Sequence, residues 1–489
     1  MKVHVKECKD IEWPSDALIL PFCEDEKGVP YPDIDDALKG LLRKVIASGE
    51  FTAKRSQVSL LHTGERIRPE RILLTGLGKK GELTKERLRQ AGGKAATYLD
   101  GLGLSHASLS MHHVLPMHFS PLPFIEGAML SLYKFRRYKK EDKASGLKEF
   151  TLLGKPERDF LDSLLWTEHL VTAVHFVRDL VNTPSNDMTP TAIAEIAKTL
   201  KKHRVSVTVL EKKDAERKGM GAYLSIARGS QEPPKFIVLR YKGNNGAPLA
   251  LIGKTVTFDS GGISLKPGEG MEKMKYDMAG GAVVLAVMRV ASAWRLPLNL
   301  IGILPATENL PGGGAFKPGD VVKTIAGKTV EIISTDAEGR LSLADAIGYA
   351  KKSRPKAIID IATLTGACSI ALGNEAIAMM GNDTCIMERL KAVGEDTFER
   401  VWQMPLYEEY GEYIKSEVAD LKNTGGRTGS LVAAGYFLKE FAGDTPWVHL
   451  DIAGTAWIEK EKPYIPKGAT GVGVRLLANF LKELSYEDN

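Results

Sequence analysis

The chain has 489 residues, of which 43% are hydrophobic and 26% are charged, the balance of an ordinary folded protein. This composition excludes a disordered or collagen-like chain, and the length suggests about two to three domains. The formal net charge of +5 is small for this length, so composition gives no reason to expect a nucleic-acid partner.

The cysteines and the apolar segments suggest a cytoplasmic protein. Cys8, Cys23, Cys368 and Cys385 form no CxxC pair, and we expect reduced thiols. The opening sequence MKVHVKECKDIEW has no apolar signal segment. The most apolar stretch, GGAVVLAVMRVASAW at 280–294, is interrupted by Arg289, which predicts a buried amphipathic helix and no membrane span.

The first half of the chain shows strand–turn–helix patterns. A strand is expected near 17–20, and RILLTGLG followed by TKERLRQAGGKAATYL within 71–99 predicts a strand and then a helix. The mixed-charge run KFRRYKKEDK at 134–143 indicates a solvated surface or hinge. Helical spacing over 157–181 ends at VNTPSNDMTP, after which TAIAEIAKTLKKH predicts another helix. We therefore expect a smaller N-terminal α/β domain at 1–150, a linker helix at 151–180 and a larger domain at 181–489.

The second half predicts a doubly wound α/β domain. Its strand candidates are apolar with little alternation, as expected for a parallel sheet that is covered on both faces. They are VSVTVLE, FIVLRY, LALIG, LNLIGILP, TVEIIS, KAIIDIAT and WVHLDIAG, with helical patterns between most of them.

Polar groups follow three of these strands, where ligands of open parallel sheets bind. The strand LALIG is followed by a loop that contains glycines and then by the start of the apolar helix. TVEIIS and KAIIDIAT are each followed by a further loop. The polar residues of the three segments are, in order, Lys254, Asp259, Lys266 and Asp277; then Asp336, Glu338 and Arg340; then Asp360 and the segment 363–366.

Four of these residues are acids: Asp259, Asp277, Asp336 and Glu338. Because ionised carboxylates that share a site repel one another, such a cluster implies cations. Hard oxygen ligands suit Mg, Mn or Zn, and two ions roughly 3.5–4 Å apart would clamp a water or hydroxide and polarise a carbonyl. The simpler alternatives are that Asp336 is a helix N-cap and that Glu338 only favours the helix dipole.

Other motifs are weaker. His203 and His449 are the only histidines after residue 175, no HExxH is present, and we expect both to be structural, with His449 making a core hydrogen bond. The segment 253–255 resembles the end of a P-loop, but Pro248 stands where that motif needs glycine. GLGKKG at 76–81 is a lone dinucleotide fingerprint, and Ser260 lies in no GxSxG elbow.

Several motifs together resemble the leucyl aminopeptidase family, also called cytosol aminopeptidases. They are KTVTFDSGGISLK, MKYDMAGGA, STDAEGRLSLADA, RDLVNTPSNDMTP, ENLPGGGAFKPGDVV, DIATLTGA and HLDIAG. The family usually has NTDAEGRL, and Ser334 replaces that asparagine here. The resemblance is strong over 170–489 and looser before 150.

The resemblance implies a ligand set for two divalent metal ions, Mn or Zn and possibly Mg. Asp259 and Glu338 would bridge them, Asp336 would complete one site, and Asp277 with the neutral amine of Lys254 would complete the other. Lys266 would stabilise the developing oxyanion, and Arg340 would hold a bicarbonate-like anion.

The resemblance also implies a side-chain pocket and a reaction. Five residues match the pocket lining: Met274, Thr363, Gly366, Ala453 and Ala456. Its apolar character suits Leu- or Met-like N-terminal residues, and the small Ala456 suggests a roomier pocket. A metal-bridged hydroxide would release the first residue from peptides with a free N-terminus. The family fold is a smaller α/β domain before a larger catalytic α/β domain, assembled as a homohexamer.

Two alternatives remain open at this point. The first is a DNA-binding or scaffold role on the same fold. The second is another dimetal hydrolase, such as a phosphoesterase, which would share the carboxylates but has no need for Lys254 as a ligand.

Overall fold

The computed structural model describes residues 1–111, 120–140 and 146–487. Contacts divide them into two compact units, one formed by Met1–Val171 with Lys460–Lys467, the other by Thr172–Glu459 with Gly468–Asn489. The helix α5 (Phe160–Asn182) runs through the division and corresponds to the helix predicted over 157–181.

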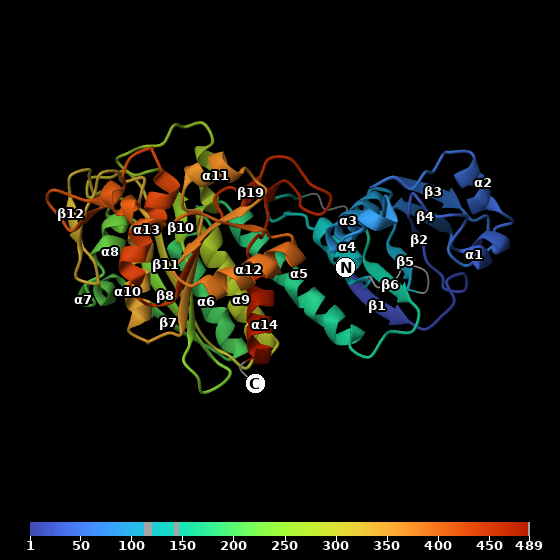
Figure 1. Cartoon of the computed structure of the whole chain (residues 1–489), viewed down its shortest axis with the longest axis horizontal. Coiled ribbons are helices and arrows are strands. Elements are labelled where there is room, and N and C mark those ends of the chain that lie inside the picture. Colours follow the sequence, from blue (N-terminus) through green and yellow to red (C-terminus); the bar gives the residue numbers. More distant parts are fainter. Residues whose placement is uncertain (112–119, 141–145, 488–489) are drawn as a thin grey trace. The chain divides into compact units, whose positions relative to one another are not determined.

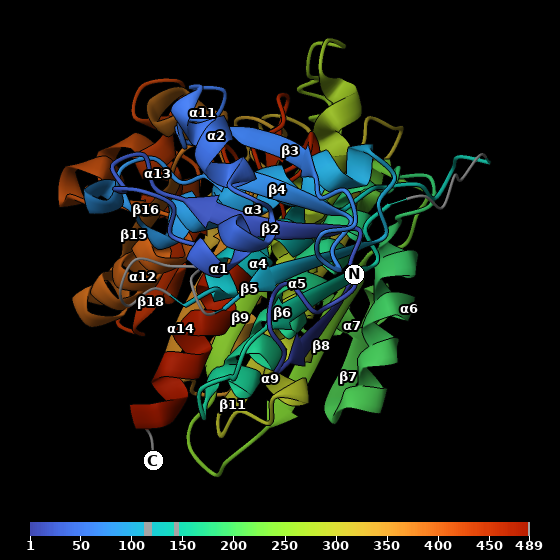
Figure 2. The ribbon, with the colours of Figure 1, turned by 90° about the vertical axis from the view of Figure 1, so that its right-hand side faces the viewer.

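The first unit is built on a twisted sheet with the strand order β1-β6-β5-β2-β4-β3 (Figures 1 and 2). Its pairs are parallel except β3 with β4. The strands are β1 (Lys2–Lys6), β2 (Ala17–Phe22), β3 (Val58–His62), β4 (Arg71–Gly76), β5 (His106–Ser110) and β6 (Glu149–Leu153).

The first unit contains the strand–turn–helix motif predicted within 71–99. The strand β4 is followed by α3, whose N-cap Thr84 accepts a hydrogen bond from the main-chain NH of Arg87. The helices before α5 are α1 (Pro32–Ala37), α2 (Leu41–Ala47), α3 (Lys85–Gly101) and α4 (Leu122–Ser131). Of the charged run at 134–143, Lys134 pairs with Asp100 and 137–140 are exposed, while 141–143 lie outside the described residues.

The second unit has a larger sheet with the order β16-β15-β18-β14-β9-β11-β8-β7, and β10 pairs with β11. The centre, from β18 to β11, is parallel as predicted, but β8 pairs antiparallel with both β11 and β7, and β15 pairs antiparallel with β18 and parallel with β16, so the sheet is mixed. The strands are β7 (Val205–Leu210), β8 (Lys235–Lys242), β9 (Leu249–Gly253), β10 (Thr255–Asp259), β11 (Asn299–Asn309), β14 (Ala357–Ala362), β15 (Ile377–Gly381), β16 (Val401–Gln403) and β18 (Trp447–Asp451).

Helices cover both faces of this sheet, which confirms the doubly wound class. On one face α8, α10 and α13 pack against the strands, and on the other α6, α9 and α12 do so, while α14 packs on α9 and α12 (Figure 1). The helices of this unit after α5 are α6 (Pro190–Lys198), α7 (Lys212–Arg217), α8 (Gly221–Ile226), α9 (Ala279–Ala293), α10 (Gly339–Lys351), α11 (Gly366–Leu372), α12 (Thr384–Thr397), α13 (Ser430–Ala442) and α14 (Val474–Glu487).

One predicted strand lies elsewhere. TVEIIS was expected in the main sheet, but only Thr329–Glu331 is a strand, β13, and it pairs with β12 (Val321–Lys323) and β17 (Leu421–Lys422) in a separate small sheet. Val330 and Ile332 are buried in the same core cluster as apolar residues of α10. This burial explains why the segment is as apolar as a strand of the main sheet. A further small pair joins β19 (Trp457–Ile458) and β20 (Gly468–Ala469).

The most apolar helix is a core element. The span Met271–Ala293 is long and apolar enough to cross a membrane, but 83% of its apolar window is buried inside the structure. It comprises the 3-10 helix η4 (Met271–Met278) followed by α9, and α9 contacts β9, β11 and β14. The predicted buried helix is therefore confirmed.

Candidate active site

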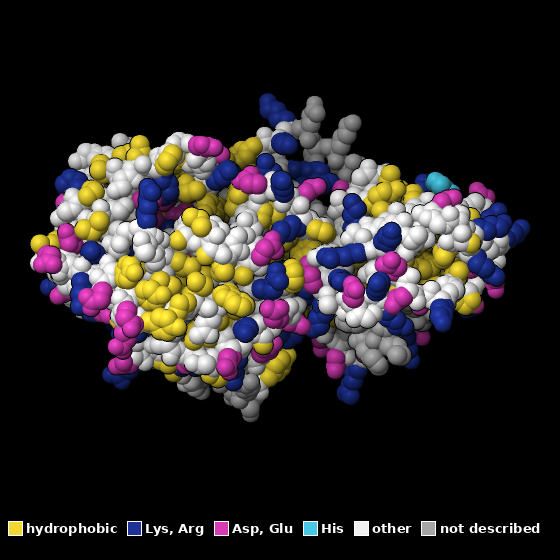
Figure 3. Space-filling model, turned by 45° about the horizontal axis from the view of Figure 1, so that its top comes forward, with side chains coloured by type: hydrophobic (Ala, Val, Ile, Leu, Met, Phe, Trp, Pro, Cys, Tyr) yellow, Lys and Arg dark blue, Asp and Glu magenta, His cyan; other side chains and the backbone are white. Residues whose placement is uncertain are grey.

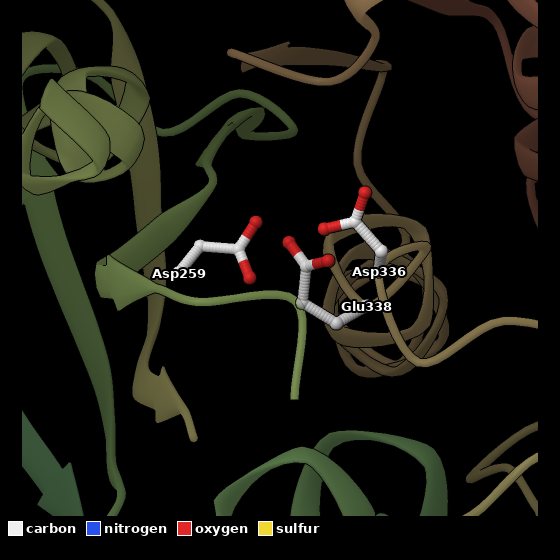
Figure 4. Close-up of side chains that lie close together, drawn as sticks. All are labelled: Asp259, Asp336 and Glu338. Atoms are coloured by element: carbon white, nitrogen blue, oxygen red, sulfur yellow. The ribbon is translucent and has the colours of Figure 1, made fainter. Parts of the chain in front are cut away.

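Three carboxylates from two loops converge near the ends of β10 and α10. Asp259 is the last residue of β10, while Asp336 and Glu338 lie in the turn just before α10, and the three side chains point toward one another (Figure 4). An oxygen from each lies within 4.8 Å of an oxygen of the others. The N-cap residue of α10 is Glu338, so the alternative that Asp336 caps this helix is wrong, and the buried side chain of Glu338 makes no capping hydrogen bond.

Lys254 joins a fourth acid to this group. Its Nζ lies 2.7 Å from Oδ2 of Asp277 and 2.8 Å from Oε1 of Glu338, and it donates a hydrogen bond of 3.1 Å to the carbonyl of Thr363. The hydroxyl of Thr363 donates to the other oxygen of Asp277 at 2.6 Å. Lys254 immediately follows β9 and Asp277 lies in η4, so the site draws on segments that are distant in the sequence.

A second lysine lies between the buried carboxylate of Asp259 and the exposed carboxylate of Asp336. The Nζ of Lys266 forms ion pairs with Oδ2 of Asp259 and Oδ1 of Asp336. Burial opposes the charge of this ammonium, but attraction by Asp259 and Glu338 outweighs it and raises the pKa of Lys266 above its usual range. Lys266 therefore stays protonated at neutral pH.

Burial makes the charges of this cluster costly. It raises the pKa of Asp277 and of Glu338, and the nearby ammonium of Lys254 only partly counteracts the effect. For Lys254 itself, burial favours the neutral amine, but attraction by Asp277 and Glu338 prevails and raises its pKa well above the usual value. Four carboxyl groups thus share only two ammonium groups.

The donor set fits hard divalent cations. Within the described part of the chain, Oδ2 of Asp277 and Oε1 of Glu338 are buried and accept no regular hydrogen bond, and their ionic contact is with Lys254. Carboxylate oxygens in this situation are the ligands that Mg, Mn and Zn accept. The residues present are therefore compatible with metal ions between the two loops.

Glycines and amides hold the first loop in place. Gly261 and Gly262 have φ of +85° and +66°, and a Cβ on Gly261 would lie 2.9 Å from Oδ1 of Asp336. Oδ1 of Asp259 accepts hydrogen bonds from the NH of Gly261 at 2.9 Å and from Nδ2 of Asn309 at 2.8 Å. These contacts orient Asp259 and leave its second oxygen facing the cluster.

The two loops are also bonded to each other. Thr335 Oγ1 accepts from the NH of Ser264 at 2.7 Å, and the NH of Thr335 donates to Ser264 Oγ at 3.1 Å. The hydroxyl of Ser334 accepts from the NH of Asp336 at 3.2 Å, so the serine supports the turn in which it replaces the usual asparagine.

Arg340 lies two residues after Glu338, in the first turn of α10. It is buried, and burial lowers the pKa of its guanidinium to about 10, which still leaves it charged at neutral pH. Its Nη1 donates to the main-chain carbonyl of Asn423 at 2.9 Å, while its Nε has no hydrogen-bond partner among the described residues. A buried cation with a free donor can hold an anion.

The predicted pocket residues come from three segments. Thr363 and Ala456 are buried, Met274 and Ala453 are partly exposed, and Gly366 is exposed at the start of α11. Thr363 contacts both Lys254 and Asp277 directly, which connects its segment to the carboxylate cluster.

Asp451 connects two of these segments, and sequence reasoning did not single it out. Its Oδ1 accepts from the main-chain NH groups of Leu364 and Ala453, each at 3.1 Å, and its Oδ2 accepts from Thr365 Oγ1 at 2.7 Å. The side chain is fully buried. The acid in HLDIAG was the available signal, but nothing in the sequence shows which loops it binds.

The histidine of the same motif is structural. Nδ1 of His449 lies 2.5 Å from Oδ1 of Asp360, whose other oxygen accepts from Nε1 of Trp447 at 2.6 Å. All three side chains are fully buried, which confirms the predicted core hydrogen bond of His449.

Fold and site together define a two-unit α/β protein with a buried, metal-compatible carboxylate cluster. Comparison with known proteins specifies the class further. The catalytic domain of the cytosol aminopeptidase family matches residues 175–478, and the N-terminal domain of the same family matches residues 19–142.

Individual relatives agree over the full length. A probable cytosol aminopeptidase from a Geobacter species is 48% identical and covers 99% of this chain and 100% of its own. One from Cenarchaeum symbiosum is 42% identical, with 95% of each chain covered. The chain belongs to the cytosol aminopeptidase family and is an aminopeptidase, a hydrolase that acts on peptides.

Solved structures show the same two-domain fold. A mutant of tomato leucine aminopeptidase matches with a TM-score of 0.89 and 31% identity over 99% of this chain and 96% of its own. The bottromycin maturation enzyme BotP matches with a TM-score of 0.85 and 31% identity over 96% and 100%. A structure of BotP in complex with Mn also matches, with a TM-score of 0.84.

Proposed function

We propose that this aminopeptidase uses two divalent metal ions and prefers Leu-like N-terminal residues. The observation that carries the proposal is the convergence of four carboxyl groups, three of them buried, on only two ammonium groups. Such a cluster is electrostatically incomplete, and divalent cations complete it. The Mn in the BotP complex supports manganese as one of the ions, with zinc or magnesium as the others to test.

The resemblance to the family supplies the proposed ligand set. Asp259 and Glu338 would bridge the ions, Asp336 would complete one site, and Asp277 with the neutral amine of Lys254 would complete the other. When bound, such ions polarise a carbonyl and make water a nucleophile near neutral pH.

Two basic residues of the chain have separate roles. Lys266 keeps its proton and is free to donate a hydrogen bond to the oxygen that becomes negative on the scissile carbonyl. Arg340, charged and buried beside Glu338, would hold a bicarbonate-like anion that accepts and returns a proton during the reaction.

The substrate is a peptide with a free N-terminus. Its first side chain would enter the pocket formed by Met274, Thr363, Gly366, Ala453 and Ala456, whose apolar atoms suit Leu- or Met-like residues. We also propose a homohexamer in the cytoplasm, and the catalytic role belongs to the domain at 181–489. A nucleic-acid role is not supported: on the face seen in Figure 3, Lys and Arg are interspersed with Asp and Glu.

Metal analysis combined with leucine-amide hydrolysis tests the proposal. Wild type is expected to bind two Mn²⁺ per chain and to hydrolyse leucine amide. Asp336→Ala should lose one ion and most activity, because one ligand set is then incomplete. Asp444→Ala, which removes an exposed acid outside the site, is the control. Full activity of Asp336→Ala would refute the assignment.

A further inference from the structure

Asn423 contacts both halves of the turn that carries two of the acids, although it lies more than eighty residues further along the chain. It follows β17 directly and is fully buried. β17 runs parallel to β13, and Lys422 lies opposite Glu331. Asn423, the next residue, therefore lies beside the segment that follows β13. Its own NH donates to the carbonyl of Glu331 at 2.9 Å.

The side-chain amide of Asn423 is saturated by main-chain groups of this turn. Its Oδ1 accepts from the NH of Ile333 at 2.8 Å and of Ser334 at 3.3 Å. Its Nδ2 donates to the carbonyl of Ser334 at 2.7 Å and of Ala337 at 3.4 Å. The bonded positions enclose Asp336 and stop one residue before Glu338.

The main-chain carbonyl of the same residue accepts from Nη1 of Arg340 at 2.9 Å. A single buried residue therefore holds the acid-bearing turn with its side chain and the guanidinium with its backbone. Groups that orient the side chains of metal ligands commonly affect metal affinity or activity by about 10- to 100-fold.

We propose that Asn423 is a positioning residue of this active site, which sets the placement of Asp336 and Glu338 relative to Arg340. The inference rests on the proposed dimetal function. Only an amide of this length satisfies both sets of partners: aspartate has the same shape but no donor, and it would place lone pairs and a charge against the carbonyls of Ser334 and Ala337.

The control is another amide that clamps main chain far from the acids. Asn382 accepts from the NH of Trp447 at 2.7 Å and donates to the carbonyls of Gly443 at 2.9 Å and Thr445 at 3.0 Å. Asn382→Asp therefore makes the same chemical change in the same kind of contact without touching the acid-bearing turn.

The experiment measures Mn²⁺ binding by calorimetry on the metal-stripped full-length chain, kcat and KM for leucine amide, and thermal unfolding. For Asn423→Asp we expect Mn²⁺ affinity or kcat to fall by about 10- to 100-fold, with KM within about threefold of wild type. Asn382→Asp should change only the unfolding temperature. Wild-type Mn²⁺ affinity and kcat in folded Asn423→Asp would overturn the inference.

Three further outcomes are decisive. If Asn423→Asp does not fold, Asn423→Ser is measured in the same way, and wild-type affinity and kcat in that variant overturn the inference. If wild type binds two Mn²⁺ and the Asn423 variants match it, only the positioning role fails. If wild type binds no Mn²⁺, the proposed function fails and the inference fails with it.

Discussion

The ammonium nitrogen of Lys254 lies 2.8 Å from Oε1 of Glu338, and both side chains are buried. The same nitrogen lies 2.7 Å from Asp277. In the absence of metal, Lys254 is thus the counter-charge of two acids, whereas a metal ligand must be a neutral amine. If Lys254 is the metal ligand proposed above, its proton and a divalent cation would compete for the same nitrogen.

Metal affinity should accordingly rise with pH. Burial favours the neutral form of Lys254, but attraction by Asp277 and Glu338 outweighs burial and raises its pKa, so the proton is present at neutral pH. Burial also raises the pKa of Asp277 and of Glu338, which strengthens the same trend. Binding must displace these protons, and it becomes easier as the pH increases.

Calorimetry in buffers of different ionisation enthalpy measures this proton release directly. Wild type should release protons on binding Mn²⁺, and Lys254→Met should release fewer. Binding without proton release, at an affinity independent of pH between 6 and 9, would contradict a role for Lys254 as a neutral ligand.

Gly339→Ala should weaken metal binding. A Cβ at this position would lie 2.5 Å from Cε and 2.7 Å from Nζ of Lys254, whose end is held by three oxygens and cannot move without loss of contacts. We expect Mn²⁺ affinity to fall by about tenfold or more. Gly348→Ala is a matched control in the same helix, since its Cβ would lie 2.6 Å from Cγ2 of Ile325, away from the acids. Equal Mn²⁺ affinities of the two variants would count against the close packing of Gly339 on Lys254.

Asp451→Asn should change substrate preference more than turnover. The Asp451 carboxylate accepts hydrogen bonds from Leu364, Thr365 and Ala453. In the asparagine variant an NH2 group would replace one carboxylate oxygen and face a hydrogen-bond donor, so at least one of these bonds would be lost. The segments that carry Thr363 and Ala453 should then separate slightly, and the ratio of kcat/KM for leucine amide over alanine amide should fall by several-fold.

The control for this variant is Asp345→Asn. Asp345 is also fully buried and accepts from the NH groups of Tyr223 at 2.8 Å and Ile325 at 2.7 Å, and burial raises its pKa to about 7. Loss of stability without a change in substrate ratio is expected for Asp345→Asn. If Asp451→Asn also lost stability without a change in substrate ratio, Asp451 would have no role in substrate preference.

Phenylalanine amide should be cleaved alongside leucine amide. Ala456 is a small, buried residue, so we expect it to leave room for a larger substrate side chain in the proposed pocket. Steady-state kinetics on leucine, phenylalanine and alanine amides of wild type and Ala456→Met give the comparison, and the larger methionine should reduce phenylalanine amide hydrolysis most. A strict preference of wild type for alanine amide would argue against a roomy pocket.

Local patterns were sufficient for the two-domain α/β class. The strand–turn–helix at 71–99 and the helix over 157–181 follow from hydrophobic periodicity and capping residues, which act over a few positions. TVEIIS shows the limit of this reasoning. Its apolar side chains predict burial correctly, but burial alone does not specify which sheet a segment joins, and β13 pairs with β12 and β17.

The sequence by itself determined the acids of the site, because Asp259, Asp336 and Glu338 lie in short motifs whose spacing and chemistry are visible without a fold. Only the tertiary structure decided what surrounds them. Asn423 and Asp451 act through main-chain NH and carbonyl groups, which every residue carries, so no residue pattern marks their partners. Such contacts depend on where distant strands place the backbone, and that placement exists only in the folded chain.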